Sequence, residues 1–249
     1  MFSIINIPQL KDNYCYLIID NNDVIIIDPA ESKLLLQYII NKNLSIKAIL
    51  LTHHHADHTA GVENIINYKK VPVYSPNKKI KYSNQIVKND DVINLNFIDF
   101  KVIETPGHTI DHIIFYNKKN KILFSGDTLF RLGCGRVFEG TYKQMYESLE
   151  KICSLDNQTN VYCGHEYTKS NLDFLLSVFP NNKKLLIENK KIDSQILKSQ
   201  SSIPFNLGNE KAINPFLNAK SSNFSEIKEK QKLSNFQLFS YLRDLKNSF

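Results

Sequence analysis

Cysteine is scarce in this chain of 249 residues. The four cysteines are Cys15, Cys134, Cys153 and Cys163, and no two of them form a CxxC pair. Four is too few for the disulfide framework of a secreted scaffold. The N-terminus also lacks a basic segment followed by an apolar stretch, the pattern of a signal peptide. We therefore expect free thiols in a reducing compartment, the cytoplasm.

Long apolar runs are also missing. The longest candidates, Val24–Ile27 and Ala48–Leu51, are far shorter than the ~18–20 residues that a membrane helix needs. Hydrophobic residues make up 42% of the chain and charged residues 22%, which is ordinary for a folded globular protein and excludes a disordered chain, a collagen and a coiled coil. We expect no membrane association.

Arginine is rare as well. Only Arg131, Arg136 and Arg243 are arginines among the 31 basic residues. The net charge of +6 comes from scattered lysines rather than from basic clusters with aromatic residues between them, so we expect no nucleic-acid partner. In a chain where most cations are lysine, a retained arginine indicates a need for the planar guanidinium fork.

Short apolar runs separated by turn residues predict a mixed α/β region. The expected strands cover residues 14–19, 23–27, 46–51, 71–74, 97–103, 112–116, 121–124 and 160–162. Helices are expected from Ser32 to Ile40 and from Thr141, which fits a capping box with Gln144. After Tyr167 we find only helical patterns, at 172–179, 184–197 and 235–245, and no convincing strand. We expect a mixed domain over residues 1–167 and a small helical domain over 168–249.

All seven histidines lie between residues 53 and 165. Four of them fall in the segment THHHADH, which directly follows the buried strand expected at 46–51. Residues two apart in extended backbone point the same way, so His53 and His55 can face one metal ion. Asp57 and His58 then offer the next two groups. Imidazoles and carboxylates without thiolates suit zinc, iron or manganese.

Three more expected strand ends carry a glycine beside a candidate ligand: Gly107 precedes His108, Gly126 precedes Asp127 and Gly164 precedes His165. Each signal alone is weak, but together with the first motif they indicate one metal site. Two histidines are expected outside the ligand set. His54 should point away from its neighbours, and His112 lies within a strand pattern typical of a buried core histidine.

The order HxHxDH, GH, GD and GHE resembles the metallo-β-lactamase superfamily. This resemblance implies an α+β protein: an αββα sandwich with metal ions at one edge between the sheets, followed here by the small helical domain. By motif, it implies a first ion bound by His53, His55 and His108, a second bound by Asp57, His58 and His165, and Asp127 bridging both.

Within the superfamily, the segments GCGRVFEG (133–140), GHEYT (164–168) and FSYLRDLKN (239–247) resemble glyoxalase II, the hydroxyacylglutathione hydrolases. The match runs from the first strand to the C-terminus. It implies that the glutathione moiety is held by Arg136, Phe138, Tyr167, Arg243 and Lys246. Arg243 and Lys246 are three residues apart, so they share a helix face, where they suit a glycyl carboxylate.

Three positions depart from the family pattern. Phe138 has no hydroxyl where some members have tyrosine, Asn218 stands where an arginine is expected, and Asp111 replaces a small residue. None of the three is among the expected metal ligands. Phe138 can pack on the substrate but cannot donate a hydrogen bond, and the consequence expected of Asn218 is a looser helical domain or looser substrate contacts.

The implied activity is hydrolysis of S-(2-hydroxyacyl)glutathione thioesters, with S-D-lactoylglutathione giving D-lactate and glutathione in the second step of methylglyoxal detoxification. A hydroxide bridging two divalent ions, zinc first and iron or manganese otherwise, attacks the thioester carbon. Asp57 and Asp127 are the catalytic residues that position it, and no protein nucleophile takes part. The partner is a small molecule, the glutathione thioester, and we expect a monomer.

Other members of the superfamily are the alternatives. A two-zinc β-lactamase commonly has cysteine at the position of Asp127 and lacks the helical tail, and a persulfide dioxygenase works with one iron. A ribonuclease of the superfamily carries a nucleic-acid-binding insertion, and a flavo-di-iron enzyme has glutamate in place of His55. A non-catalytic binding module has no need of the complete ligand set.

Overall fold

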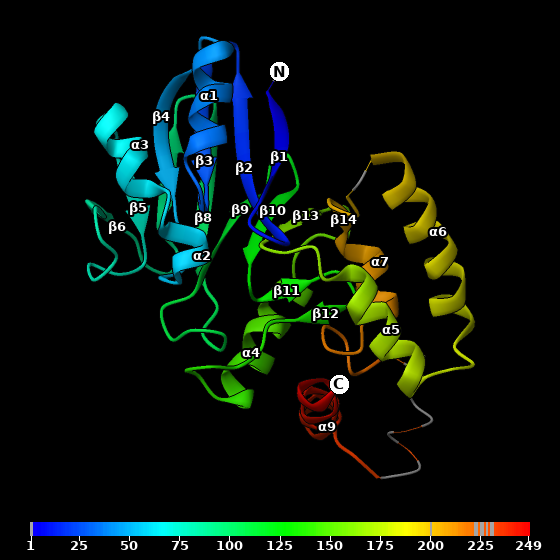
Figure 1. Cartoon of the computed structure of the whole chain (residues 1–249). Coiled ribbons are helices and arrows are strands. Elements are labelled where there is room, and N and C mark those ends of the chain that lie inside the picture. Colours follow the sequence, from blue (N-terminus) through cyan, green and yellow to red (C-terminus); the bar gives the residue numbers. More distant parts are fainter. Residues whose placement is uncertain (1, 200, 222–223, 225–226, 228, 230–231) are drawn as a thin grey trace. The chain divides into compact units, whose positions relative to one another are not determined.

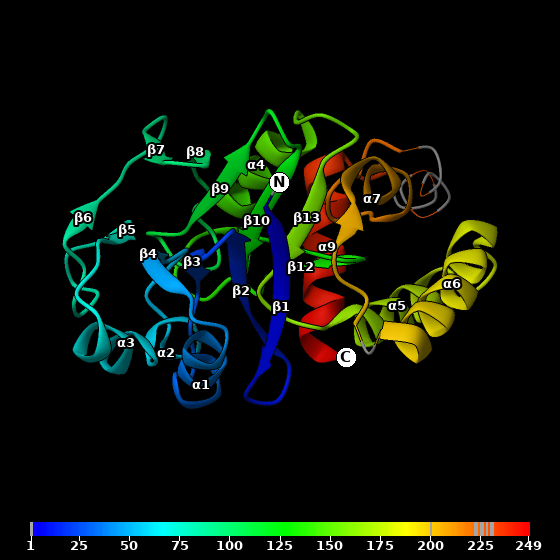
Figure 2. The same cartoon turned by 90° about the horizontal axis from the view of Figure 1, so that it is seen from above.

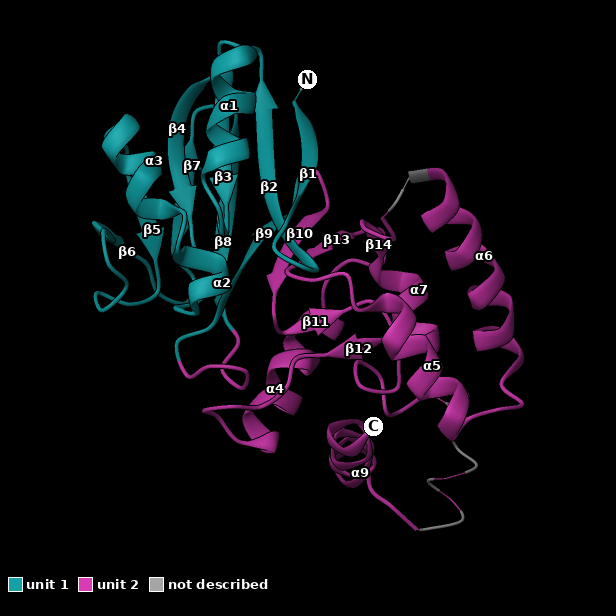
Figure 3. Ribbon diagram, viewed as in Figure 1, with its two compact units in different colours: residues 1–104, 111–119 teal, residues 105–110, 120–249 magenta. Residues whose placement is uncertain are grey.

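The computed structural model describes residues 2–199, 201–221, 224, 227, 229 and 232–249. Backbone contacts divide the chain into two compact units (Figure 3). Unit 1 holds the residues up to 104 together with 111–119, and unit 2 holds 105–110 and 120–249. The domain boundary expected at residue 167 follows sequence pattern rather than backbone contacts, and it stays a prediction.

Unit 1 is built on a six-stranded sheet in which β1 to β6 follow one another in chain order. Strands β7, β8 and β9 form a separate antiparallel ladder. Figure 2 shows helices α1 and α3 on one face of the six-stranded sheet and strands β8 and β9 on the other. The elements are β1 Ser3–Gln9, β2 Asn13–Asp20, β3 Asp23–Ile27, α1 Lys33–Asn41, β4 Ser45–Leu50, α2 Ala56–Thr59, α3 Val62–Tyr68, β5 Val73–Ser75, β6 Gln85–Ile86, β7 Val92–Leu95, β8 Ile98–Glu104 and β9 Ile113–Asn117.

The centre of unit 1 is the parallel pair β3–β4. Val24–Ile27 of β3 and Ala48–Leu50 of β4 are continuous apolar runs because both faces of the pair are covered there, as is usual for parallel strands. Leu35 and Ile39, one turn apart on α1, are completely or almost completely buried against them, and each such side chain stabilises the fold by about 1.5–3 kcal/mol. This packing fixes the carboxyl ends of β3 and β4, where polar side chains begin.

Unit 2 combines short strands with helices (Figure 1). Strand β10 pairs with β13 in parallel, β13 pairs with β14 antiparallel, and β11 and β12 form a small hairpin. Helix α4 packs against α9, and α5 against α6. The elements are β10 Ile122–Gly126, β11 Leu129–Phe130, β12 Gly133–Cys134, α4 Tyr142–Cys153, β13 Asn160–Cys163, α5 Thr168–Val178, α6 Lys183–Ser199, β14 Phe205–Asn206, α7 Leu207–Ile213 and α9 Asn235–Ser248. Within the described residues, no helix has the length and apolar character to cross a bilayer.

Most of the predicted elements are confirmed. Asn21 takes a positive φ of 52° in the expected turn between β2 and β3, and both hydrogen bonds of the capping box at Thr141 are present. The prediction that no strand follows Tyr167 is wrong, because β14 pairs with β13 there. A strand of 2 residues is too short to show alternation. Helix α5 also begins at Thr168 rather than at 172.

A buried carboxyl group makes the stability of unit 2 depend on pH. Glu210 is 1% exposed, and burial raises its pKa to about 7. Its carboxylate accepts hydrogen bonds from the Leu132 amide at 2.8 Å and from the Asn214 side chain at 3.1 Å. Because the folded protein holds this proton more tightly than the unfolded chain, stability falls as pH rises from about 4.5 to about 7.

We expect Glu210→Gln to remove that slope. Glutamine still accepts from Leu132 but carries no charge, so unfolding free energies from urea titrations between pH 5 and pH 8 should lose a pH dependence of roughly 3 kcal/mol. If the variant and the natural protein lose stability in parallel over this range, the assignment to Glu210 is wrong.

Candidate metal centre

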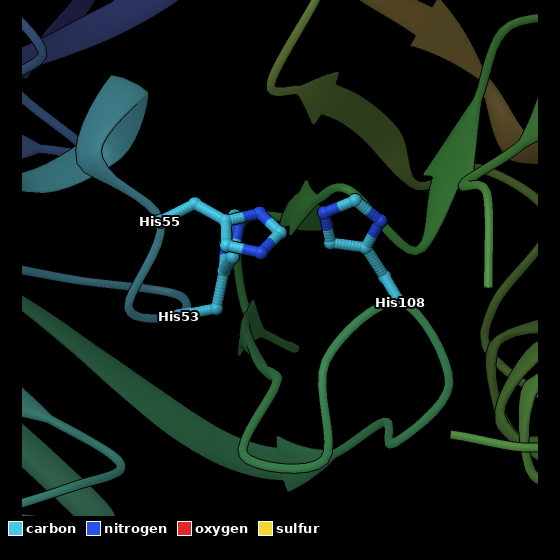
Figure 4. A group of neighbouring side chains, drawn as sticks. All are labelled: His53, His55 and His108. Carbon is cyan, nitrogen blue, oxygen red and sulfur yellow. The ribbon is translucent and has the colours of Figure 1, made fainter. Parts of the chain in front are cut away.

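The THHHADH segment brings imidazoles together at the carboxyl end of β4. His53 and His55 lie on the loop after β4, and Asp57 and His58 lie on the short helix α2. The His53 ring centroid is 4.7 Å from that of His55 and 4.3 Å from that of His58. Figure 4 shows the His53 and His55 rings as neighbours, and it also shows His108, which belongs to the turn after β8. Unit 1 therefore presents a set of nitrogen donors with a carboxylate beside them.

Asp28, at the end of β3, organises this loop. Its carboxylate accepts from the Thr52 amide at 2.8 Å and the Thr52 hydroxyl at 2.7 Å. It also lies 3.1 Å from His58 Nδ1. A carboxylate at one ring nitrogen is the usual partner of a metal-ligating histidine, because it leaves the other nitrogen, here Nε2, for the metal. Asp28 is not among the residues that the sequence motifs single out, although a carboxylate directly after a buried strand is a signal that could have found it.

Asn13 fixes the carboxylate of Asp57 in the same unit. Its amide donates to Asp57 Oδ2 at 3.1 Å and to the Asp57 backbone oxygen at 3.0 Å. His58 Nε2 lies 3.8 Å from the same Oδ2. Asp57 is therefore held with one oxygen toward the imidazole of His58. Asn13, the first residue of β2, belongs to no sequence motif that points to this role.

The other three expected ligands meet within unit 2. Asp127 follows β10 and His165 follows β13, the two parallel strands of the unit. Asp127 Oδ2 lies 3.4 Å from His108 Nε2 and 3.2 Å from His165 Nε2. All three side chains are about 95% buried. Two ring nitrogens therefore converge on one carboxylate oxygen.

Hydrogen bonding at His108 shows that this arrangement suits a cation. Its Nδ1 lies 2.8 Å from the Arg136 carbonyl oxygen, which can only accept, so Nδ1 carries the proton. In the neutral imidazole, Nε2 then directs a lone pair toward the carboxylate of Asp127. Two acceptors facing one another repel, and a divalent ion coordinated by both relieves the repulsion. The donor set thus fits a metal site.

Three of the expected substrate-binding residues lie beside expected metal ligands of unit 2. The Tyr167 ring stacks on His165 at 4.7 Å, with the two planes 8° apart. Phe138 is 61% exposed and its ring meets the edge of His108 at 5.2 Å. The Arg136 guanidinium lies over the Phe138 ring at 5.5 Å. These contacts place aromatic and cationic groups around two imidazoles.

The other two lie on α9. Arg243 is only 5% exposed and donates from Nη1 to the Cys134 carbonyl oxygen at 3.0 Å. Lys246 is half-buried and donates to the Ser170 carbonyl and hydroxyl oxygens at 2.9 and 3.1 Å. Burial first, and the charge of Arg243 second, lower the pKa of Lys246 to about 8. The helix thus carries two cations one turn apart, and the first is tied to β12.

The two histidines expected outside the ligand set, and two of the positions that depart from the family pattern, each contact a defined partner. His54 Nδ1 lies 2.9 Å from Asp111 Oδ1, so the departure at residue 111 supplies the partner of this histidine. His112 is completely buried, as expected, and stacks on His53 at 4.9 Å. The Asn218 amide donates to the Lys211 carbonyl oxygen at 2.9 Å and so joins the chain after α7 to that helix.

Comparison with known proteins decides the family. The metallo-β-lactamase superfamily model matches residues 10–165, and the model of the hydroxyacylglutathione hydrolase C-terminus matches residues 166–249. A hydroxyacylglutathione hydrolase of Pectobacterium atrosepticum is 42% identical over 99% of this chain and 100% of its own. One of Wigglesworthia glossinidia brevipalpis is 43% identical over 99% of both chains. The chain belongs to the hydroxyacylglutathione hydrolase family.

This membership confirms the family that the sequence motifs indicated. The crystal structure of ETHE1 from Myxococcus xanthus has the same fold, with a TM-score of 0.67 and 24% identity over all of both chains. The predicted metallo-β-lactamase fold with a helical C-terminal domain is therefore confirmed. The hydroxyacylglutathione hydrolase family and the His/Asp clusters together indicate binding of divalent metal.

Proposed function

We propose that this chain hydrolyses S-(2-hydroxyacyl)glutathione thioesters, S-D-lactoylglutathione among them, to glutathione and the 2-hydroxy acid. The carrying observation is the tandem match: a metallohydrolase model is followed without a gap by the hydroxyacylglutathione hydrolase C-terminus. Relatives with about the same length and 42–43% identity support the same activity.

We propose that two divalent ions are bound, zinc first and iron or manganese as alternatives. His53, His55 and His108 would hold one ion, Asp57, His58 and His165 the other, and Asp127 would serve both. The first two sets are groups of side chains that could each hold an ion, and their imidazole and carboxylate donors are those that zinc prefers. When bound, such ions supply Lewis-acid chemistry that makes water nucleophilic at neutral pH and polarises a carbonyl.

The chain's own residues orient the reaction. The carboxylates of Asp57 and Asp127 would accept hydrogen bonds from the attacking water and so direct its lone pair at the thioester carbon. The leaving thiol has a pKa of about 8.5 and needs no general acid. Cys134 and Cys163 are unsuited to act as nucleophiles, because burial raises the pKa of both thiols.

The glutathione moiety is assigned to Arg136, Phe138, Tyr167, Arg243 and Lys246. The aromatic rings would pack on the peptide, and the cations would hold its carboxylates. Lys246 contributes only while it is an ammonium. Because its pKa is about 8, this contribution is lost as pH rises through that value.

We therefore expect the KM for S-D-lactoylglutathione to rise above about pH 8, while kcat changes little. In Lys246→Arg, whose side chain stays charged, the rise should be absent over pH 7–9.5. Steady-state kinetics at a series of pH values measure this. A KM that is flat in the natural protein, or that rises equally in the variant, would remove Lys246 from the proposed substrate site.

The test of the proposed function is the loss of thioester absorbance from S-D-lactoylglutathione by the full chain, before and after chelation. We expect rapid hydrolysis, its loss with a chelator and its return with zinc. A protein that holds two ions and leaves this thioester intact would reject the proposed substrate. Repeating the reconstitution with iron and manganese ranks the three metals.

We also propose a monomer that acts in the cytoplasm. None of the four cysteines, all of which are described residues, forms a disulfide, and three of them are buried, as suits a reducing compartment. Light scattering on the metal-loaded protein should give a mass near 28.8 kDa. A dimer mass would reject the monomer.

A further inference from the structure

Arg131 is the arginine that the proposed function leaves without a role. It lies between β11 and β12 and is 6% exposed. Its Nη2 donates to Glu188 Oε1 at 2.7 Å, and its Nη1 donates to the Ser202 carbonyl oxygen at 2.7 Å and to Gln195 Oε1 at 2.9 Å. A guanidinium reaches acceptors in two directions at once, which the single nitrogen of lysine does not. The Arg131 guanidinium therefore connects the turn between β11 and β12 both to α6 and to the segment before β14.

Ser202, whose carbonyl oxygen accepts from Arg131, also binds the carboxylate of Glu166. Its amide donates to Glu166 Oε2 at 2.7 Å and its hydroxyl to Glu166 Oε1 at 2.5 Å. Because the Ser202 hydroxyl proton is used in this way, the Thr168 hydroxyl, 2.5 Å away, is the donor to Ser202. Ser202 is completely buried. Both oxygens of one carboxylate are thus held by one residue, whose own carbonyl is held by Arg131.

Glu166 directly follows His165 in the loop after β13. On the other side of His165, the Cys163 thiol donates to the His165 carbonyl oxygen at 3.3 Å. The Tyr167 ring stacks on the imidazole. The direction of the His165 ring therefore depends on the position of this loop. The hydrogen bonds of Ser202 to Glu166 connect the loop to the chain before β14 and, through Arg131, to α6.

We propose that Arg131 is a positioning residue for His165. Through Ser202 and Glu166 it holds the loop that aims Nε2 of His165 at Asp127 Oδ2, 3.2 Å away. The inference rests on the proposed role of His165 as a metal ligand. It gives the helical part of unit 2 a second task beside substrate binding, which is to stabilise one ligand of the metal centre.

The test measures zinc binding by competition with a chromophoric chelator. In Arg131→Lys, the positive charge stays and the fork is lost, so we expect the affinity for one of the two ions to fall about 10- to 100-fold, as when outer partners of metal ligands are removed. The affinity for the other ion should stay within about twofold. KM should be unchanged, and kcat should recover with excess zinc.

Lys169→Met is the matched control. Lys169 also ties α5 to α6, through Asp193 and Asn189 at 2.9 Å each, but on the exposed surface. We expect this variant to keep both zinc affinities. Equal losses of affinity in the two variants, or unchanged affinities in Arg131→Lys even with a lower melting temperature, would overturn the inference.

Ser202→Ala decides the matter if Arg131→Lys fails to fold. This variant removes one hydroxyl and keeps the amide bond to Glu166, so the same zinc affinity should fall by a smaller factor. Unchanged affinity in Ser202→Ala would then overturn the inference. Chelator competition measures zinc binding without turnover, so its result does not depend on the proposed hydrolytic activity. The proposed function fails only if the natural protein leaves S-D-lactoylglutathione intact.

Discussion

Asp127→Ala is expected to reduce kcat/KM for S-D-lactoylglutathione by about 10³-fold or more, because in the proposed site Asp127 both holds the metal ions and orients the attacking water. The structure gives a reason for the joint loss. One carboxylate oxygen of Asp127 lies next to the Nε2 atoms of both His108 and His165. Without this oxygen, the two imidazoles lose the carboxylate that would bind a metal ion together with them. Hydrolysis kinetics and the zinc content of the purified variant measure the two effects.

The control for this variant is Asp99→Ala. Asp99 is an exposed aspartate on β8, so its removal changes the net charge equally and should alter neither zinc content nor rate. Near-normal activity of Asp127→Ala with two ions retained would show that Asp127 serves neither ion.

Gly135→Ala is expected to have the second large effect. The new Cβ would lie 1.8 Å from the Asp127 carbonyl oxygen, a distance that atoms do not tolerate. The Gly135 amide also bonds to the Thr128 carbonyl oxygen at 3.2 Å, so the two segments cannot separate without losing this contact. We expect a loss of about 3 kcal/mol in unfolding free energy, together with weaker zinc binding, because the segment that carries Asp127 must move.

Gly208→Ala is the control that separates the loss of stability from the loss of zinc affinity. Its Cβ would lie 2.8 Å from the Asn157 carbonyl oxygen, so it too should destabilise unit 2, but in the first turn of α7 rather than beside Asp127. Thermal unfolding should show a loss of stability in both variants, and zinc competition a loss of affinity in Gly135→Ala alone. If both variants bind zinc normally, Gly135 does not support the Asp127 segment.

The sequence predicted those features that come from local pattern. The hairpin at Asn21, the buried strand β4 and the capped helix α4 each depend on residues that are close together along the chain. The same holds for the HxHxDH motif, because a strand end and a period of two are enough to direct His53 and His55 to one side.

The features that sequence missed come from contacts between distant residues. Asp28 meets His58 only because β3 pairs with β4, and Asn13 meets Asp57 across 44 positions of the chain. Strand β14 exists because β13 offers it a partner. The rarity of arginine did indicate a special need at Arg131, but the acceptors that explain it lie on α6 and before β14.

The most direct test of the account is the rate of S-D-lactoylglutathione hydrolysis as a function of zinc ions bound per chain, starting from metal-free protein. The account predicts no turnover without metal, binding that ends at two ions per chain, and full activity when both are bound. Full activity without metal, or two bound ions and an untouched thioester, would contradict it.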